Sequence, residues 1–138
     1  SRLCFPLYAC AKEVVRAYTP FLDELGITYT QYIAMMVIWE KESVSMKELG
    51  EELYLDSGTL TPMLKKLEQS GFVTRQRDRL DERSVVIKVT SEGMRLREKA
   101  VKIPMQIAKC LELKAEDAKE LYRILHNILD GFKMKKGE

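Results

Sequence analysis

The sequence has little histidine, few cysteines and no long apolar run. One histidine and three scattered cysteines among 138 residues argue against a metal site built from clustered ligands. No stretch approaches the roughly 20 apolar residues of a membrane span, and no leader has the pattern of a signal peptide. We therefore expect a cytoplasmic protein without metal or cofactor, whose cysteines are buried thiols or redox groups rather than a disulfide framework.

The chain also lacks a strong net charge, internal repeats and low-complexity segments. Its formal charge is only +2, so any contact with nucleic acid must come from local patches. A length of 138 residues suits one domain with a buried core. Because the chain begins at Ser1 and not at methionine, we expect further residues to precede it.

The stretch from residue 46 to residue 93 organises the chain. Helical patterns at 46–54 and 57–70 are followed by two strands, 72–76 and 84–89, around a polar tip. Ser45 and Glu48 form a capping-box pattern, Asp56 or Ser57 can cap the second helix, and Gly71 ends it. Pro62 predicts that this helix starts late, near Thr59, or bends. The order predicts a winged helix-turn-helix in a mainly α protein with a small β ribbon.

The second helix of such a unit docks in the DNA major groove. Its predicted outer face carries small hydroxyls first and cations last, namely Ser57, Thr59, Thr61, Lys65 and Lys66. The polar tip, which we call the wing tip, carries Arg77, Arg79 and Arg83, and Asp81 is placed to hold Arg83. Arginine suits a narrow minor groove. The helix alone is equally compatible with an ordinary solvated face, and the arginine-rich wing favours DNA.

Four further helical patterns flank this head. We expect helices at 3–25, ended by Gly26; at 31–41, capped by Thr30; at 91–111, capped by Ser91 and bent at Pro104; and at 114–132. The second should be central because it is apolar on most sides. Residues 42–44 can add a third strand beside the wing, and the tail from 133 should fray. The terminal helices carry apolar stripes that a second copy would bury, which predicts a two-fold dimer.

Cys4 lies near the start of the first helix, where the positive potential of a helix N-terminus favours a thiolate. A thiolate attacks peroxides, although a lone cysteine in a helix is more often a small buried hydrophobe. Cys10 follows six residues later, about 9 Å along the helix. The two sulfurs cannot bridge, so we interpret Cys10 as a packing residue.

The run LYLDSGTLTP from Leu53, followed by Gly71, by DERS from Asp81 and by TSEG from Thr90, resembles the MarR family of transcriptional regulators. Within it the chain is similar to the organic-hydroperoxide sensors of the OhrR type. The resemblance covers nearly the whole chain. It implies one MarR-type domain, with a head at about 44–90 and dimerisation helices at about 3–25 and 91–135, that binds a palindromic operator as a homodimer.

The same resemblance assigns roles near the cysteines. Cys4 matches the peroxide-reactive cysteine of these sensors, in a similar L-C-F-x-L-Y segment, although Pro6 departs from the usual apolar residue. Tyr18 and Tyr29 match the tyrosines through which a partner subunit hydrogen-bonds that sulfur. Cys110 matches by position the resolving cysteine that forms an intersubunit disulfide. If Cys110 is inert, a small cellular thiol would cap the oxidised Cys4.

The leading hypothesis is a dimeric repressor that is released from its operator when an organic hydroperoxide oxidises Cys4. The peroxide would enter an apolar pocket near Phe5, Tyr18, Tyr29 and Tyr32. The alternative is a MarR-type repressor that responds to a small anionic or phenolic ligand without cysteine chemistry. A thiol peroxidase is a third hypothesis. We expect no enzyme, because neither a base nor an arginine flanks Cys4 in a catalytic arrangement.

Overall fold

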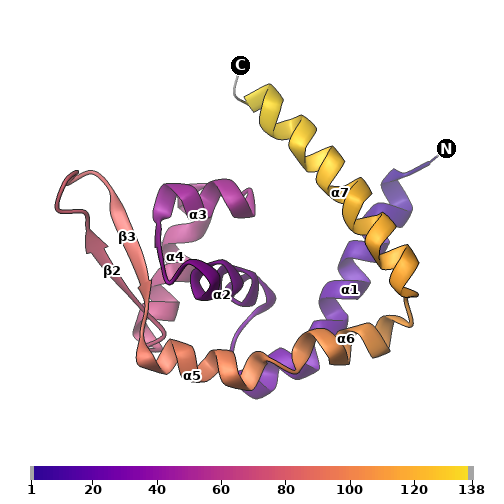
Figure 1. Cartoon of the computed structure of the whole chain (residues 1–138), viewed down its shortest axis with the longest axis horizontal. Helices are drawn as coiled ribbons and strands as arrows, with labels where there is room; N and C mark the ends of the chain where they lie inside the picture. The colour runs from indigo at the N-terminus through magenta and orange to yellow at the C-terminus, as the bar shows by residue number, and fades with distance from the viewer. Residues whose placement is uncertain (1, 137–138) are drawn as a thin grey trace. The chain divides into compact units, whose positions relative to one another are not determined.

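The computed structural model describes residues 2–136, with side chains for 2–133, and divides into two compact units, Ser1–Ile103 and Pro104–Glu138. The predicted class is confirmed: helices dominate and one small antiparallel sheet accompanies them (Figure 1). The elements are α1 Cys4–Leu25, α2 Tyr29–Lys41, β1 Ser43–Ser45, α3 Met46–Leu53, α4 Ser57–Gln69, β2 Val73–Arg77, β3 Val85–Val89, α5 Ser91–Ala100, α6 Ile103–Leu111 and α7 Ala115–Lys136.

The first unit is built around α2, as its apolar sequence predicts. This helix contacts α1, α3, α4, α5, β1 and β3. Its residues Ala34, Met35 and Ile38 are fully buried, and so are Leu49 of α3 and Leu64 of α4. The apolar faces of both helices of the helix-turn-helix therefore close on one central helix, which leaves the polar face of α4 exposed to solvent.

The sheet has the strand order β1-β3-β2. Strand β3 pairs antiparallel with both neighbours, so that Ile87 lies opposite Val44 of β1 and Arg75 of β2. The predicted third strand beside the wing is thus confirmed. In Figure 1 the β2–β3 hairpin extends away from α3 and α4, which exposes its connecting tip.

Two helix starts differ from the prediction by one or two residues. Thr28, not Thr30, caps α2: its hydroxyl accepts from the Gln31 N–H at 3.1 Å, and the Gln31 side chain accepts from the Thr28 N–H at 2.9 Å. Thr90, not Ser91, caps α5, because its hydroxyl accepts from the Gly93 N–H and also donates to the Gly71 carbonyl. Only half of the predicted capping box at Ser45 forms: the Ser45 hydroxyl accepts from the Glu48 N–H, but the Glu48 side chain does not return a bond to the Ser45 backbone. The Glu48 carboxylate bonds Lys41.

The predicted helix 91–111 is two helices, and this prediction was wrong. Helix α5 ends at Ala100 and α6 begins at Ile103. Pro104 has no N–H to donate to the Ala100 carbonyl four residues earlier, and its ring would clash with that carbonyl. The prediction of a late start for α4 was also wrong, because this helix begins at Ser57 and contains Pro62.

The second unit contains most of α6 and all of α7. Helix α7 continues to Lys136, so the tail expected to fray from residue 133 is helical over most of its length, and residues 137–138 lie outside the described range. The apolar stripe of α7 is exposed in the single chain, with Leu121, Leu125, Ile128 and Phe132 each at least 40% exposed. In residues 2–136, no helix has both the length and the apolar character that crossing a membrane needs.

Candidate nucleic-acid interface and redox site

The α3–α4 turn holds the two helices of the helix-turn-helix close together. Tyr54 ends α3 in a left-handed conformation with φ 57°, and the Leu55 N–H donates to the Gly50 carbonyl at 3.0 Å. A side chain at Gly50 would lie 2.8 Å from the Leu55 oxygen and 3.0 Å from the Leu60 Cδ1. The glycine is therefore needed for the close approach of α4 to α3.

Helix α4 presents the predicted polar face. Asp56 caps it by accepting from the Thr59 N–H at 2.8 Å, and this hydrogen bond lowers the pKa of the Asp56 carboxyl. Ser57, Thr59, Lys65 and Lys66 are exposed, and Thr61 is half-buried. The opposite face, formed by Leu60, Met63, Leu64 and Leu67, is buried. Small polar groups at the start of the helix and lysines further along are suited to base edges and phosphates respectively.

The end of α4 is joined to the wing by an ion pair that the sequence reasoning missed. Gly71, at φ 84°, ends the helix in a Schellman arrangement. This turn brings Glu68 beside Arg75 of β2. The Arg75 Nε and Nη2 donate to Glu68 Oε1 at 3.2 and 3.1 Å, and the Arg75 backbone N–H donates to Oε2 at 3.3 Å. Three donors on one carboxylate fix the angle between α4 and the base of the wing.

Replacing Glu68 by glutamine is therefore expected to weaken DNA binding, although it removes a negative charge near the polyanion. The amide keeps the volume of the side chain but accepts only through one oxygen, so the wing can rotate against α4. We expect a loss of about fivefold in affinity, which corresponds to about 1 kcal/mol, the scale of one ordinary hydrogen bond. Glu82→Gln at the exposed wing tip is the matched control and should bind as tightly as the wild type or more tightly. Fluorescence anisotropy with labelled duplex checks both; a Glu68→Gln protein that binds more tightly than the wild type contradicts the clamp.

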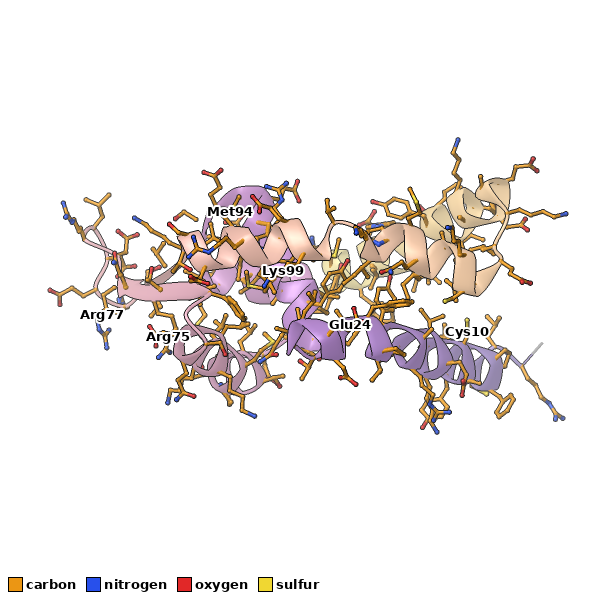
Figure 2. All side chains as sticks on the ribbon, turned by 90° about the horizontal axis from the view of Figure 1, so that it is seen from below. Cys10, Glu24, Arg75, Arg77, Met94 and Lys99 are labelled. Carbon is orange, nitrogen blue, oxygen red and sulfur yellow. The ribbon has the colours of Figure 1, made fainter. Side chains whose placement is uncertain are left out.

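The wing tip, residues 77–83, is closed by hydrogen bonds. The Asp78 N–H donates to the Ser84 carbonyl at 2.8 Å, and the Arg77 Nη1 donates to the Glu82 carbonyl at 2.7 Å. Figure 2 shows Arg75 near the base of the hairpin and Arg77 further out. Arg83 is almost fully exposed, while Asp81 accepts from its backbone N–H at 3.0 Å and lies 3.6 Å from its Nε. The predicted Asp81–Arg83 contact is confirmed.

A cluster of three tyrosines joins α1 to α2. The ring of Tyr18 lies 5.1 Å from that of Tyr29 and 5.8 Å from that of Tyr32. Burial, and then the neighbouring Tyr29, raise the pKa of Tyr18; burial, and then Tyr18 and Tyr29, raise the pKa of Tyr32. Both phenols are therefore protonated at neutral pH and can donate hydrogen bonds.

Cys4 is the first residue of α1 and is exposed, with Pro6 in the same first turn. Tyr18 follows it by 14 residues of the same helix, about 21 Å of axial rise. Cys4 and the tyrosine cluster of one chain therefore cannot meet. Tyr8, which the sequence reasoning left without a role, lies four residues after Cys4, on the same helix face.

The two other cysteines are also exposed and unbridged. Cys10, which Figure 2 labels on α1, was interpreted as a packing residue; it is not packed in the single chain. The exposed apolar side chains of Phe5 and Leu7 precede it on the same helix, and Leu3 lies just before the helix start. Cys110 lies on α6 in the second unit. Among the described residues, no group of acidic, histidine or cysteine side chains could hold a metal ion.

A hollow of about 160 Å³ lies away from the tyrosines, between the end of α1, Phe72 and α5. It is lined by two acidic and two basic side chains, Glu24, Glu92, Arg95 and Lys99, together with Leu25 and Leu96. Figure 2 shows Glu24 and Lys99 on this part of the first unit. Its mixed charge distinguishes it from the apolar pocket predicted near Tyr18.

Comparisons with known proteins identify relatives over nearly the whole chain. A family model described as transcriptional regulator SarA/Rot matches residues 16–100. The organic hydroperoxide resistance transcriptional regulator of Bacillus subtilis (strain 168) is 49% identical over 135 residues, which cover 98% of this chain and 92% of that protein. Reduced AbfR bound to DNA is 35% identical, with a TM-score of 0.79 over 94% of this chain and 91% of that one. A mutant of MarR from E. coli, complexed with operator DNA, is 26% identical, with a TM-score of 0.78 over 89% and 90%.

Proposed function

The chain belongs to the SarA/Rot type of MarR-family transcriptional regulators. From this premise we propose that it is a dimeric repressor and that an organic hydroperoxide, by oxidising Cys4, releases it from its operator. The observation that carries the proposal is the position of Cys4. An exposed thiol occupies the first turn of α1, and Tyr18, the member of the tyrosine cluster on the same helix, lies about 21 Å further along it.

Operator binding rests on the head. The exposed face of α4, with Ser57, Thr59, Thr61 and Lys65, would enter the major groove, and the wing with Arg77, Arg79 and Arg83 would reach the adjacent minor groove. Asp81 would hold Arg83 in place. Solved relatives named for DNA or operator complexes, AbfR and MarR, share this fold. Two heads related by a two-fold axis would contact half-sites about 34 Å apart in a palindromic duplex.

Dimerisation would bury the apolar residues that one chain leaves exposed. At the N-terminal end of α1 these are Phe5, Leu7 and Tyr8, together with Leu3 just before the helix, and on α7 they are Leu121, Tyr122, Ile124, Leu125, Ile128 and Phe132. So many large apolar side chains on terminal helices exceed the scattered exposure that is normal for a monomer. A partner chain would also bring its own tyrosine cluster to Cys4 and complete an apolar pocket with Phe5, which no single chain can do.

The chemistry at Cys4 is a two-electron oxidation. The thiolate attacks one peroxide oxygen, the S–O bond forms as the O–O bond breaks, and the departing alkoxide takes up a proton to become an alcohol. The phenol O–H groups of Tyr18 and Tyr29, donating to the sulfur, would stabilise the thiolate. The sulfenic acid that forms no longer offers them a full negative charge. Loss of those contacts would shift the terminal helices and the spacing of the two heads.

The fate of the sulfenic acid depends on Cys110. If Cys110 of the other chain attacks, an intersubunit disulfide forms and water leaves. If it does not, a small thiol reacts at Cys4 instead. The relatives include a structure of disulfide-formed AbfR, which supports disulfide formation as an outcome of oxidation. The relative from Bacillus subtilis is named for organic hydroperoxide resistance, which supports the peroxide as the signal.

Counting thiols together with operator binding tests the proposal and its alternative. The probe is a labelled duplex carrying the palindrome that the reduced protein selects from random-sequence DNA. Three thiols per chain titrate in the reduced protein. After cumene hydroperoxide, operator release should accompany the loss of one thiol per chain for a sulfenic acid, or of two for a Cys4–Cys110 disulfide. Release by salicylate with all thiols intact, and none by peroxide, would instead identify a ligand-controlled repressor.

A further inference from the structure

A row of aromatic rings runs along α2 from the tyrosine cluster towards α5. Tyr29 and Tyr32 both contact Tyr18 of α1, and Tyr32 lies 6.4 Å from Trp39, with the two rings at 71°. Tyr32 and Trp39 are seven residues apart and therefore lie on one face of the helix. Tyr32 is 4% exposed and Trp39 6% exposed. Tyr32 and Trp39 are thus part of the packed interior, whereas Tyr18 and Tyr29 are half-buried.

Trp39 ends the row with a buried hydrogen bond. Its indole Nε1–H donates to the Gly93 carbonyl, 54 residues further along the chain, at 2.9 Å. Indole has this one donor and no acceptor. If α2 moved relative to α5, the donor would be left unpaired in an apolar environment, which is unfavourable. We therefore expect the Trp39–Gly93 hydrogen bond to be either fully formed or broken.

Gly93 lies in a tightly packed junction between α5, β3 and the turn before β2. A side chain there would overlap the Phe72 carbonyl oxygen and approach Val89 Cγ2. Thr90 binds the same turn, since its hydroxyl donates to the Gly71 carbonyl at 2.5 Å and its N–H donates to the Phe72 carbonyl at 3.1 Å. Gly71 and Phe72 form the turn that ends α4 and begins β2. A displacement of Gly93 is consequently transmitted to the helix and the strand that form the DNA-binding surface.

We propose that Trp39 is a positioning residue that couples the tyrosine cluster to the orientation of α4 and the wing. This inference rests on the proposed role of Cys4. When the tyrosines lose the thiolate, Tyr18 and Tyr29 repack against Tyr32. Tyr32 displaces the Trp39 ring, and the Trp39–Gly93 hydrogen bond breaks. Close-packed interiors pass such shifts on, because packed side chains cannot deform continuously.

The test compares wild-type protein with Trp39→Phe, which keeps an aromatic ring beside Tyr32 and removes the donor to Gly93. The quantity measured is the operator dissociation constant after stoichiometric oxidation with cumene hydroperoxide, divided by that before oxidation, with the selected duplex as probe. We expect Cys4 to oxidise at the wild-type rate, while the ratio falls about tenfold towards one, a typical coupling between sites. Met36→Leu, at an exposed position of the same helix, should keep the wild-type ratio.

A Trp39→Phe protein with the wild-type ratio overturns the inference. If oxidation of Cys4 does not change the operator affinity of the wild-type protein, the proposed function itself is overturned. This is a separate result, obtained before any variant is made. If the Trp39→Phe protein does not fold, the fluorescence of the wild-type protein still tests the coupling. Trp39 is the only tryptophan of the chain, so its fluorescence should shift to longer wavelength when Cys4 is oxidised in the DNA-free dimer. Unchanged emission overturns the coupling.

Discussion

A Cys4→Ser protein is expected to bind the operator as the reduced wild type does and to stay bound in the presence of organic hydroperoxide. The serine hydroxyl fills nearly the same volume and can still meet the phenol groups of Tyr18 and Tyr29, but it does not attack a peroxide. In the wild type, oxidation should weaken binding by one to two orders of magnitude, about the range of a coupling free energy of 1–3 kcal/mol. In Cys4→Ser this factor should be one, as measured by anisotropy with the selected duplex.

The other two cysteines supply the matched controls for this experiment. Cys10 is on the same helix and is also exposed, so Cys10→Ser should keep the full response. Cys110→Ser should also release the operator, but without an intersubunit disulfide on a non-reducing gel. Release of Cys4→Ser by peroxide would contradict the assignment of the sensor, whatever the other two variants did.

Arg83→Ala should give the second large effect, a loss of operator affinity of about 10- to 100-fold, since an arginine contact in a groove contributes about 1–3 kcal/mol. Arg83 is highly exposed, with 94% of its side chain accessible, and its Nε lies 3.6 Å from Asp81 Oδ1. Its guanidinium is therefore accessible to a narrow minor groove, which arginine suits. Arg83→Lys should recover only part of the loss, because lysine lacks the planar fork.

The control for Arg83→Ala is Arg16→Ala, which removes the same charge from an exposed arginine of α1 that pairs with Glu13. It should bind DNA normally. The dependence of operator affinity on salt concentration distinguishes a contact of Arg83 with phosphate from a contact in the groove. A contact with phosphate would lower the salt slope by about one for each site, whereas a groove contact would also relax the sequence preference at the wing. Wild-type affinity and preference in Arg83→Ala would contradict the role of the wing.

The local parts of this structure were predictable from the sequence, and the junctions were not. Asp56 and Gly71 bound α4 as predicted, because a cap and a stop signal flank an unbroken apolar period. At the start of α5 two hydroxyl residues compete. Thr90 becomes the cap because it also bonds Gly71, 19 residues away, a contact that no local pattern contains.

The candidate site divides in the same way. Short-range spacing gave the outer face of α4 and the Asp81–Arg83 contact. The roles of Cys4 and the tyrosines came from resemblance, because a single exposed thiol carries no local signature of reactivity. The Glu68–Arg75 clamp and the Trp39–Gly93 hydrogen bond join residues across a turn or across a long stretch of the chain. Such pairs cannot be predicted from local sequence patterns, because they form only when the elements pack together.

Native mass spectrometry of the wild-type protein with the selected duplex, titrated with cumene hydroperoxide, tests the central claim most directly, because it reads the state of Cys4 separately in DNA-bound and DNA-free molecules. The account predicts that DNA-bound dimers carry reduced Cys4 and that DNA-free dimers carry one added oxygen or a disulfide at that residue. DNA-bound dimers fully oxidised at Cys4, or released dimers with Cys4 still reduced, would contradict it.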